Sequence, residues 1–123
     1  MGKIKSYEDL FVFQKADDLA VRIYEVTTAF PKHELYGLVS QMRRAAVSVP
    51  SNIVEGFTSH TRKEYVHFLR IAWGSLAELE YQIKFSKRIG YLKEKKVIDE
   101  LVERTTEIGK MLNGLISKLK TSN

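Results

Sequence analysis

The strongest constraint on the fold of this chain is a helical spacing of apolar residues that repeats in four segments. Within each segment apolar side chains recur at intervals of three and four residues, and nowhere do they alternate over a useful length as in a β-strand. The four apolar stripes are Phe13, Ala16, Ala20, Ile23, Thr27 and Phe30; Leu38, Met42, Ala45, Val49 and Ile53; Tyr65, Leu69, Ala72, Leu76, Leu79 and Ile83; and Ile98, Leu101, Thr105, Ile108, Leu112, Leu115 and Leu119. We expect these stripes to form the core of an all-α protein.

Three breaks separate the segments. Pro31 biases the preceding residue away from helix, and Gly90 follows its segment as a C-terminal glycine. Thr61 and Glu64 form the T-x-x-E capping box of a helix start. The breaks predict helices over about residues 7–30, 35–55, 62–89 and 93–119. Because short connections make long neighbouring helices antiparallel, we expect a single domain, residues 1–123, folded as an up-down-up-down four-helix bundle.

The composition fits one soluble domain. The chain has 123 residues, of which 44% are hydrophobic, and this is enough for a core. No apolar run approaches the roughly 18 residues that a membrane span requires, and no signal-peptide pattern opens the chain. We therefore expect a cytoplasmic protein without a membrane partner. The absence of cysteine excludes disulfides, thiolate catalysis and sulfur-ligated metal, and we predict no cofactor.

The formal charge is mildly basic and unevenly distributed. The net charge is +5, and residues 61–90 alone carry +3. A basic surface suits nucleic acid or an acidic protein partner, although many proteins with neither partner are equally basic.

A proline lies inside the second predicted helix, in the stretch SQMRRAAVSVPSNIVEGF. Pro50 lacks the N–H that would bond to the Ala46 carbonyl, which costs roughly 3 kcal/mol inside a helix. The apolar stripe nevertheless continues across it in unbroken register. We therefore predict a helix kinked at Pro50, in which Ser51 or a neighbouring hydroxyl can bond to a loosened carbonyl.

Two further stripes lie beside the predicted core. On the second helix, helical spacing aligns Gln41, Arg44, Ser48, Asn52 and Glu55 on a polar line. On the third helix, a stripe opposite the apolar one is basic at both ends and small at its centre: Lys63, His67, Arg70, Gly74, Ala77, Tyr81, Lys84 and Arg88. Each stripe is consistent with a solvated surface or with a surface that contacts a subunit or ligand.

The chain resembles the bacterial 23S rRNA intervening-sequence proteins, which are often misnamed ribosomal proteins. The resemblance covers nearly the whole chain and is carried by VFQKADDLAVRIYEVTTAFPKHELYGL, by SQMRRAAVSVPSNIVEG and by KEYVHFLRIAWGSLAELEYQI. Phe13 stands where many members carry tryptophan, and Val54 where alanine is usual. The central stretch is long and unusual in composition, so the resemblance is specific.

The resemblance implies a four-helix bundle that assembles into a ring-like homopentamer. The chain is also similar to the accessory variability protein of diversity-generating retroelements, a basic pentamer that binds nucleic acid and a reverse transcriptase. For most intervening-sequence proteins a biochemical activity is not established, so the resemblance implies none for this chain. The positions that match the family's central stretch are Arg43, Arg44, Ser48, Pro50, Ser51, Asn52, Glu55 and Gly56.

Our leading hypothesis is a non-enzymatic, nucleic-acid-binding oligomer that binds RNA or DNA, or acts as a reverse-transcriptase accessory factor. The candidate phosphate contacts are Arg43, Arg44, Arg62, Lys63, Arg70, Lys84, Lys87 and Arg88. The candidate polar interface residues are Gln41, Ser48, Pro50, Ser51, Asn52, Glu55 and Gly56. The alternative is a protein-interaction scaffold whose basic groups pair with acids on neighbouring subunits or a partner.

An enzyme is a third and remote hypothesis. His60, Glu64 and His67 are spaced as possible metal ligands, and the last two form the E-x-x-H unit of di-iron bundles. Such bundles need two E-x-x-H units and two further glutamates, whereas this chain has one unit. Because Glu64 is also explained as a capping residue, we predict no metal site and no catalytic residues.

Overall fold

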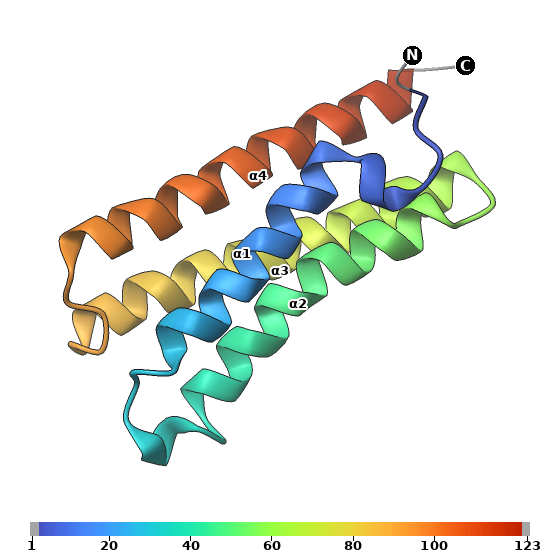
Figure 1. The fold of residues 1–123 in the computed structure, drawn as a ribbon. Helices are drawn as coiled ribbons and strands as arrows, with labels where there is room; N and C mark the ends of the chain where they lie inside the picture. Colours follow the sequence, from blue (N-terminus) through green and yellow to red (C-terminus); the bar gives the residue numbers. More distant parts are fainter. Residues whose placement is uncertain (1–2, 122–123) are drawn as a thin grey trace.

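The structure, a computed structural model that describes residues 3–121, contains four α-helices arranged as an antiparallel bundle (Figure 1). The helices are α1 (Phe11–Thr27), α2 (Leu38–Phe57), α3 (Arg62–Arg88) and α4 (Lys95–Thr121). Short 3-10 helices, η1 (Tyr7–Asp9) and η2 (Lys32–Glu34), precede α1 and α2. The predicted all-α, up-down-up-down bundle is confirmed, and α1 begins at the same end of the bundle at which α4 ends (Figure 1).

The apolar stripes form the core as predicted. Every predicted stripe residue is buried or half-buried, and the centre is made by fully buried side chains such as Ile23, Met42, Leu79 and Leu101. Burying a side chain of this size is worth roughly 1.5–3 kcal/mol. α2 and α3 pack most extensively, whereas α1 and α4 make the least extensive contact of the neighbouring pairs.

The first helix is shorter than predicted at both ends. It begins at Phe11 because Ser6 and Asp9 form a capping box around η1 and Leu10 is extended, with φ −78° and ψ 124°. It ends at Thr27 and not at Phe30. Phe30 lies in the turn before Pro31 and packs against Tyr91, with ring centroids 5.4 Å apart and an interplanar angle of 57°.

The second helix begins at Leu38, three residues later than predicted, because the carboxylate of Glu34 caps its first N–H. The Leu38 N–H donates to Glu34 Oε1 at 3.1 Å, and the Tyr91 hydroxyl donates to Glu34 Oε2 at 2.8 Å. These two hydrogen bonds hold the pKa of the Glu34 carboxyl below its usual value. Glu34 therefore joins the start of α2 to the connection between α3 and α4.

The third and fourth helices lie close to their predicted bounds. The Thr61 and Glu64 capping box is confirmed: the Glu64 N–H donates to Thr61 Oγ1 at 3.0 Å, and the Thr61 N–H donates to Glu64 Oε1 at 3.3 Å. α3 ends at Arg88, and Gly90 follows with a φ of 86°. The fourth helix starts at Lys95 and not at residue 93.

α2 runs without interruption through Pro50, whose ring is buried in the bundle. The continuous helix is confirmed, but Ser51 is exposed and its hydroxyl makes no hydrogen bond within residues 3–121. The side chain that bonds to a carbonyl near the proline is instead Asn52, whose Nδ2 donates to the Ser48 carbonyl at 2.8 Å. Pro50 leaves the Ala46 carbonyl, and not the Ser48 carbonyl, without its helical donor, so the Asn52 bond does not replace the one that the proline removes.

Candidate functional site

The stripe opposite the core of α3 is exposed along its whole length. We call it the outer α3 face; its residues are Lys63, His67, Arg70, Gly74, Ala77, Tyr81, Lys84 and Arg88. Tyr81 is 64% exposed, and a Cβ added at Gly74 would meet nothing within 4 Å. The protomer therefore leaves this face open along the helix.

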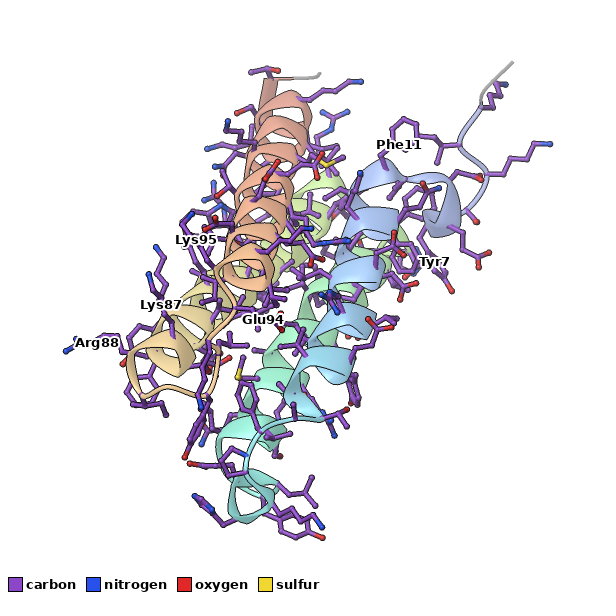
Figure 2. The ribbon with its side chains drawn as sticks, turned by 60° about the vertical axis from the view of Figure 1, so that its left-hand side comes forward. Tyr7, Phe11, Lys87, Arg88, Glu94 and Lys95 are labelled. Carbon is purple, nitrogen blue, oxygen red and sulfur yellow. The ribbon has the colours of Figure 1, made fainter. Side chains whose placement is uncertain are left out.

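The positive charge of the chain is concentrated where α3 turns into α4. Residues 84–96 hold one acid, Glu94, and six cations, a local net charge of +5 that equals the charge of the whole chain. We call these cations the cationic turn; they are Lys84, Lys87, Arg88, Lys93, Lys95 and Lys96. Figure 2 shows Lys87, Arg88 and Lys95 gathered at this turn. Of these six cations, only the three on α3, Lys84, Lys87 and Arg88, were predicted from the sequence as phosphate contacts.

Four of these six cations have no acidic partner within the part of the chain that the structure describes. Lys84 lies 3.7 Å from Glu80, and Lys95 lies 2.7 Å from Asp99. No ion pair is formed by the other four, which are Lys87, Arg88, Lys93 and Lys96. The cationic turn is thus only partly neutralised within the protomer.

The turn lines two shallow grooves between α3 and α4. The first is lined by Lys84, Lys87, Arg88, Ile98, Asp99, Val102 and Glu103, and the second by Lys87, Gly90, Leu92, Lys93, Lys95, Ile98 and Asp99. Lys87, Ile98 and Asp99 are common to both, so the grooves adjoin. Cations from two helices and their connection therefore reach one surface.

The backbone conformation of this turn is determined by the hydrogen bonds that end α3. The Tyr91 N–H donates to the Ser86 carbonyl at 2.9 Å, and the Gly90 N–H donates to the Lys87 carbonyl at 3.1 Å. This is a Schellman motif, and its left-handed position suits glycine because glycine has no Cβ to clash. Lys87 and Arg88 lie in the last turn of α3, where cations favourably oppose the helix dipole.

The two adjacent arginines of the second helix have different surroundings. Arg43 is half-buried; its Nε donates to Thr27 Oγ1 at 3.0 Å, its Nη2 donates to the Tyr24 carbonyl at 3.3 Å, and its guanidinium lies 4.6 Å from the Tyr24 ring centroid. Arg44 is exposed and has no partner among the described residues. Arg43 thus joins α1 to α2, and Arg44 points to solvent.

The other predicted phosphate contacts lie on the surface of α3. Arg62 and Lys63 are exposed in its first turn, and Arg70 is exposed two turns later. Together with the cationic turn they place basic side chains at both ends of the outer α3 face.

The polar line of the second helix is divided between interior and surface. Ser48 and Ser75 are joined across α2 and α3 by a hydrogen bond of 2.8 Å between their hydroxyls, and Asn52 Nδ2 donates to Ser48 Oγ at 3.1 Å. Gln41 and Glu55 are exposed. The centre of the line therefore binds α3 of the same chain, while its ends face solvent.

Two members of the central stretch are packing residues. Pro50 is buried, and Gly56 is buried where α2 meets the start of α3. A Cβ at Gly56 would lie 2.9 Å from Tyr65 Cδ1 and 3.2 Å from Phe68 Cβ. The glycine permits this close approach.

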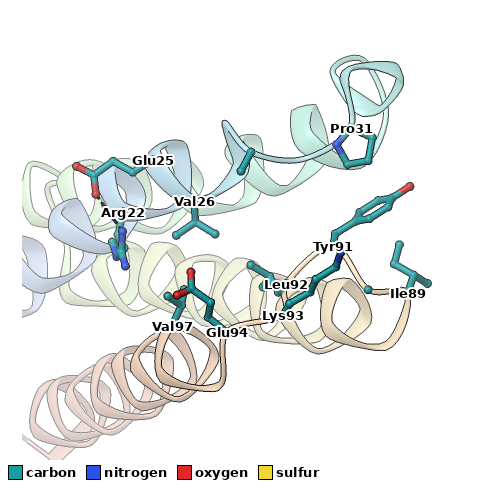
Figure 3. A pocket seen from close by; sticks show the side chains of 12 residues that line it. Arg22, Glu25, Val26, Pro31, Ile89, Tyr91, Leu92, Lys93, Glu94 and Val97 are labelled. Carbon is teal, nitrogen blue, oxygen red and sulfur yellow. Dashed lines mark hydrogen bonds and ion pairs between the residues drawn. The ribbon is translucent and has the colours of Figure 1, made fainter.

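A hollow with a volume of about 750 Å³ lies at the α3–α4 connection on the side of α1 (Figure 3). Its lining includes the apolar side chains Val26, Leu92 and Val97. Arg22 and Glu25, which also line it, form an ion pair at 3.5 Å. Arg22 also donates to Glu100 from Nη2 at 2.9 Å. The Arg22 and Glu25 charges are therefore paired, whereas Lys93 and Glu94, which also line the hollow, form no ion pair within residues 3–121.

The possible metal ligands form no site in the described chain. Within residues 3–121 no group of three or more His, Asp or Glu side chains is placed to hold a metal ion. Glu64 Oε1 accepts the N–H groups of His60 and Thr61, at 3.1 and 3.3 Å. Nor does the described part of the chain contain a helix long and apolar enough to cross a membrane.

Comparison with known proteins supports the resemblance noted in the sequence. The structure is similar to the crystal structure of a protein of unknown function from the S23 ribosomal protein family of Bacteroides thetaiotaomicron, with a TM-score of 0.76 and 26% identity over 85% of this chain and 97% of that one. The family model for the 23S rRNA-intervening sequence protein matches residues 8–114. The chain therefore belongs to the 23S rRNA-intervening sequence protein family.

Proposed function

We propose that this protein is a non-enzymatic oligomer that binds nucleic acid, RNA in particular, through a basic surface. The observation that carries the proposal is the cationic turn, which concentrates a local charge of +5 on thirteen residues and leaves Lys87, Arg88, Lys93 and Lys96 without acidic partners within residues 3–121. Phosphates are the complementary charge for such a surface. A reverse-transcriptase accessory role is the more specific form of this proposal.

The proposed phosphate contacts follow from exposure. They are Arg44, Arg62, Lys63, Arg70, Lys84, Lys87 and Arg88, to which the structure adds Lys93 and Lys96. Arg43 is left out because its donors bind Thr27 and Tyr24. Assembly into a homopentameric ring, which the family resemblance suggested, would multiply the protomer's charge about fivefold and strengthen attraction to a polyanion.

A salt-titrated binding assay with single-stranded RNA tests the proposal. Binding should weaken steeply with salt, with log K falling by about 0.7 per log unit of salt for each phosphate contacted. The double variant Lys87→Glu, Arg88→Glu should weaken binding and flatten this slope. The double variant Lys32→Glu, Lys120→Glu, which reverses two exposed cations outside the proposed contacts, is the charge-matched control. No binding at low salt, or a flat salt response, would refute the proposal.

A protein-interaction scaffold is the second candidate. It is favoured by the exposed apolar side chains Ile71 and Trp73, which are 40% and 43% exposed on α3. Reversing the charge of Arg44 separates the two candidates. If Arg44→Glu dissociates the oligomer, as judged by solution mass, this arginine is a subunit contact; if the oligomer persists and RNA binding falls, it is a phosphate contact.

A further inference from the structure

Two aromatic rings lie on the surface of α3 between its cations. Tyr81 is 64% exposed and Phe85 is 38% exposed, and their ring centroids are 6.0 Å apart at an interplanar angle of 32°. They are separated by one helical turn, so both belong to the same side of the helix. Their exposure leaves ring surface uncovered within the protomer.

The surroundings of this ring pair are small on one side and cationic on the other. Toward the start of α3 lie Gly74 and Ala77, both exposed, and no atom stands within 4 Å of a Cβ position at Gly74. Toward its end lie Lys84 and Arg88, both exposed; Lys84 pairs with Glu80 at 3.7 Å, whereas Arg88 has no acidic partner within residues 3–121. A planar ligand can therefore approach the Tyr81 ring over small residues while an attached anion reaches the cations.

We propose that Tyr81 and Phe85 form a stacking platform for the bases of single-stranded nucleic acid, with Lys84 and Arg88 bound to the flanking phosphates. This inference rests on the proposed function and specifies its ligand as single-stranded. Bases stack on aromatic side chains only when they are unpaired, because a duplex keeps its bases stacked on one another. A basic track interrupted by exposed rings is the combination that single-strand-binding proteins use.

The platform has one competing explanation, a contact with another protein chain. Exposed aromatic rings are also common in protein interfaces. The charge favours nucleic acid: Arg88 has no acidic partner within residues 3–121, and neighbouring Lys87 also has none. An apolar protein surface would leave these cations desolvated and unpaired.

The test compares a single-stranded RNA of about 16 nucleotides with a blunt duplex of the same sequence. The wild-type protein should bind the single strand more tightly. Tyr81→Ala should weaken single-strand binding by roughly 5- to 150-fold, the range for loss of one stacked base, and Tyr81→Phe should retain binding because it keeps the ring. The salt slope should not change in Tyr81→Ala, since no phosphate contact is removed.

Tyr36→Ala is the matched control, because Tyr36 is 93% exposed on the connection between α1 and α2 and lies outside the platform. Failure to bind either RNA at low salt would refute the proposed function itself. Equal affinity for both RNAs, or unchanged binding by Tyr81→Ala, would overturn the platform and leave the proposed function standing. A change in solution mass in Tyr81→Ala would identify the rings as a subunit contact and also overturn it.

Discussion

Arg43 donates a hydrogen bond from Nε to the hydroxyl of Thr27 at 3.0 Å, and this bond ties α2 to the last turn of α1. Its neighbour Arg44 is exposed and has no partner in the described chain. The helix turns by about 100° per residue, so adjacent side chains cannot share one environment. Arg43 is therefore a structural residue, and Arg44 is a candidate contact.

Removal of the two arginines should have different effects on stability. Arg43→Ala should lower the free energy of unfolding by about 1–2 kcal/mol, because it breaks charged hydrogen bonds to Thr27 and Tyr24 and the contact with the Tyr24 ring. Arg44→Ala should change it by less than about 0.5 kcal/mol. Urea unfolding followed by circular dichroism measures both, and equal losses would contradict the division.

Alanine at two glycines should shift stability in opposite directions. Gly56→Ala should destabilise the protein by about 1–3 kcal/mol, because its Cβ would lie 2.9 Å from Tyr65 Cδ1. Gly74→Ala should raise helix stability by up to about 1 kcal/mol, because the site is open and alanine favours helix. Thermal unfolding checks both. Loss of oligomer in Gly74→Ala would show that another backbone approaches there.

Gln82 is a buried amide with an unsatisfied oxygen. It is 4% exposed; its Nε2 lies 3.4 Å from Glu78 Oε2, and its Oε1 has no hydrogen-bond partner among the described residues. Gln82→Met should keep the volume and stabilise the protein by roughly 1 kcal/mol, since it removes that desolvated oxygen. Gln41→Met, at an exposed site on α2, is the control. Clear destabilisation by Gln82→Met in urea unfolding would mean that Gln82 has a partner in solution.

Glu100 should contribute a pH-dependent stability. Its carboxylate accepts hydrogen bonds from Arg22 Nη2 at 2.9 Å and from Arg104 Nε at 2.9 Å. The bond from Arg22 is the main cause that holds the pKa of Glu100 below its ordinary value of 4.5, and Arg104 adds to it. A lowered folded-state pKa gives stability that is present above the unfolded-state pKa and is lost as pH falls through the folded-state pKa.

The variant Glu100→Gln isolates this contribution. The wild-type protein should be more stable than the variant at pH 7. The difference should shrink as pH falls below about 4, where the carboxyl protonates in the unfolded state, and it should be lost once the pH falls through the lower folded-state pKa. Urea unfolding across this range measures the difference. A difference independent of pH would show that the ion pairs between α1 and α4 contribute nothing through charge.

Much of the fold could be predicted because its signals are local. The Thr61 and Glu64 capping box and the Gly90 helix end each depend on residues within one turn of each other, and both are confirmed. The late start of α2 comes from a longer-range partner. α2 starts at Leu38 because Glu34 caps its N–H and the Tyr91 hydroxyl holds Glu34. Tyr91 is 57 residues from Glu34 in the sequence, so the periodicity of the apolar residues could not predict this contact.

The candidate site was predictable only in part. Helical spacing correctly placed the outer α3 face on the surface, because the face opposite an apolar stripe must lie away from the core. Spacing placed Arg44 and not Arg43 on the polar line of the second helix, but it could not show that Arg43 binds Thr27, since that hydroxyl belongs to another helix. Nor could spacing predict that Lys93 and Lys95 lie in one groove with Lys87, because it is the turn at Gly90 that brings them together.

The sequence by itself determined the helical class, the number of helices, the core residues and the family, because all of these follow from patterns within one helix or from matching residue types. Only the tertiary structure decided which polar residues face inward. Ser48 bonds to Ser75 and Arg43 bonds to Thr27, whereas Arg44 and Tyr81 remain exposed. The physical reason is that a polar side chain is satisfied equally well by water or by a partner on another helix, and only helix packing brings that partner within reach.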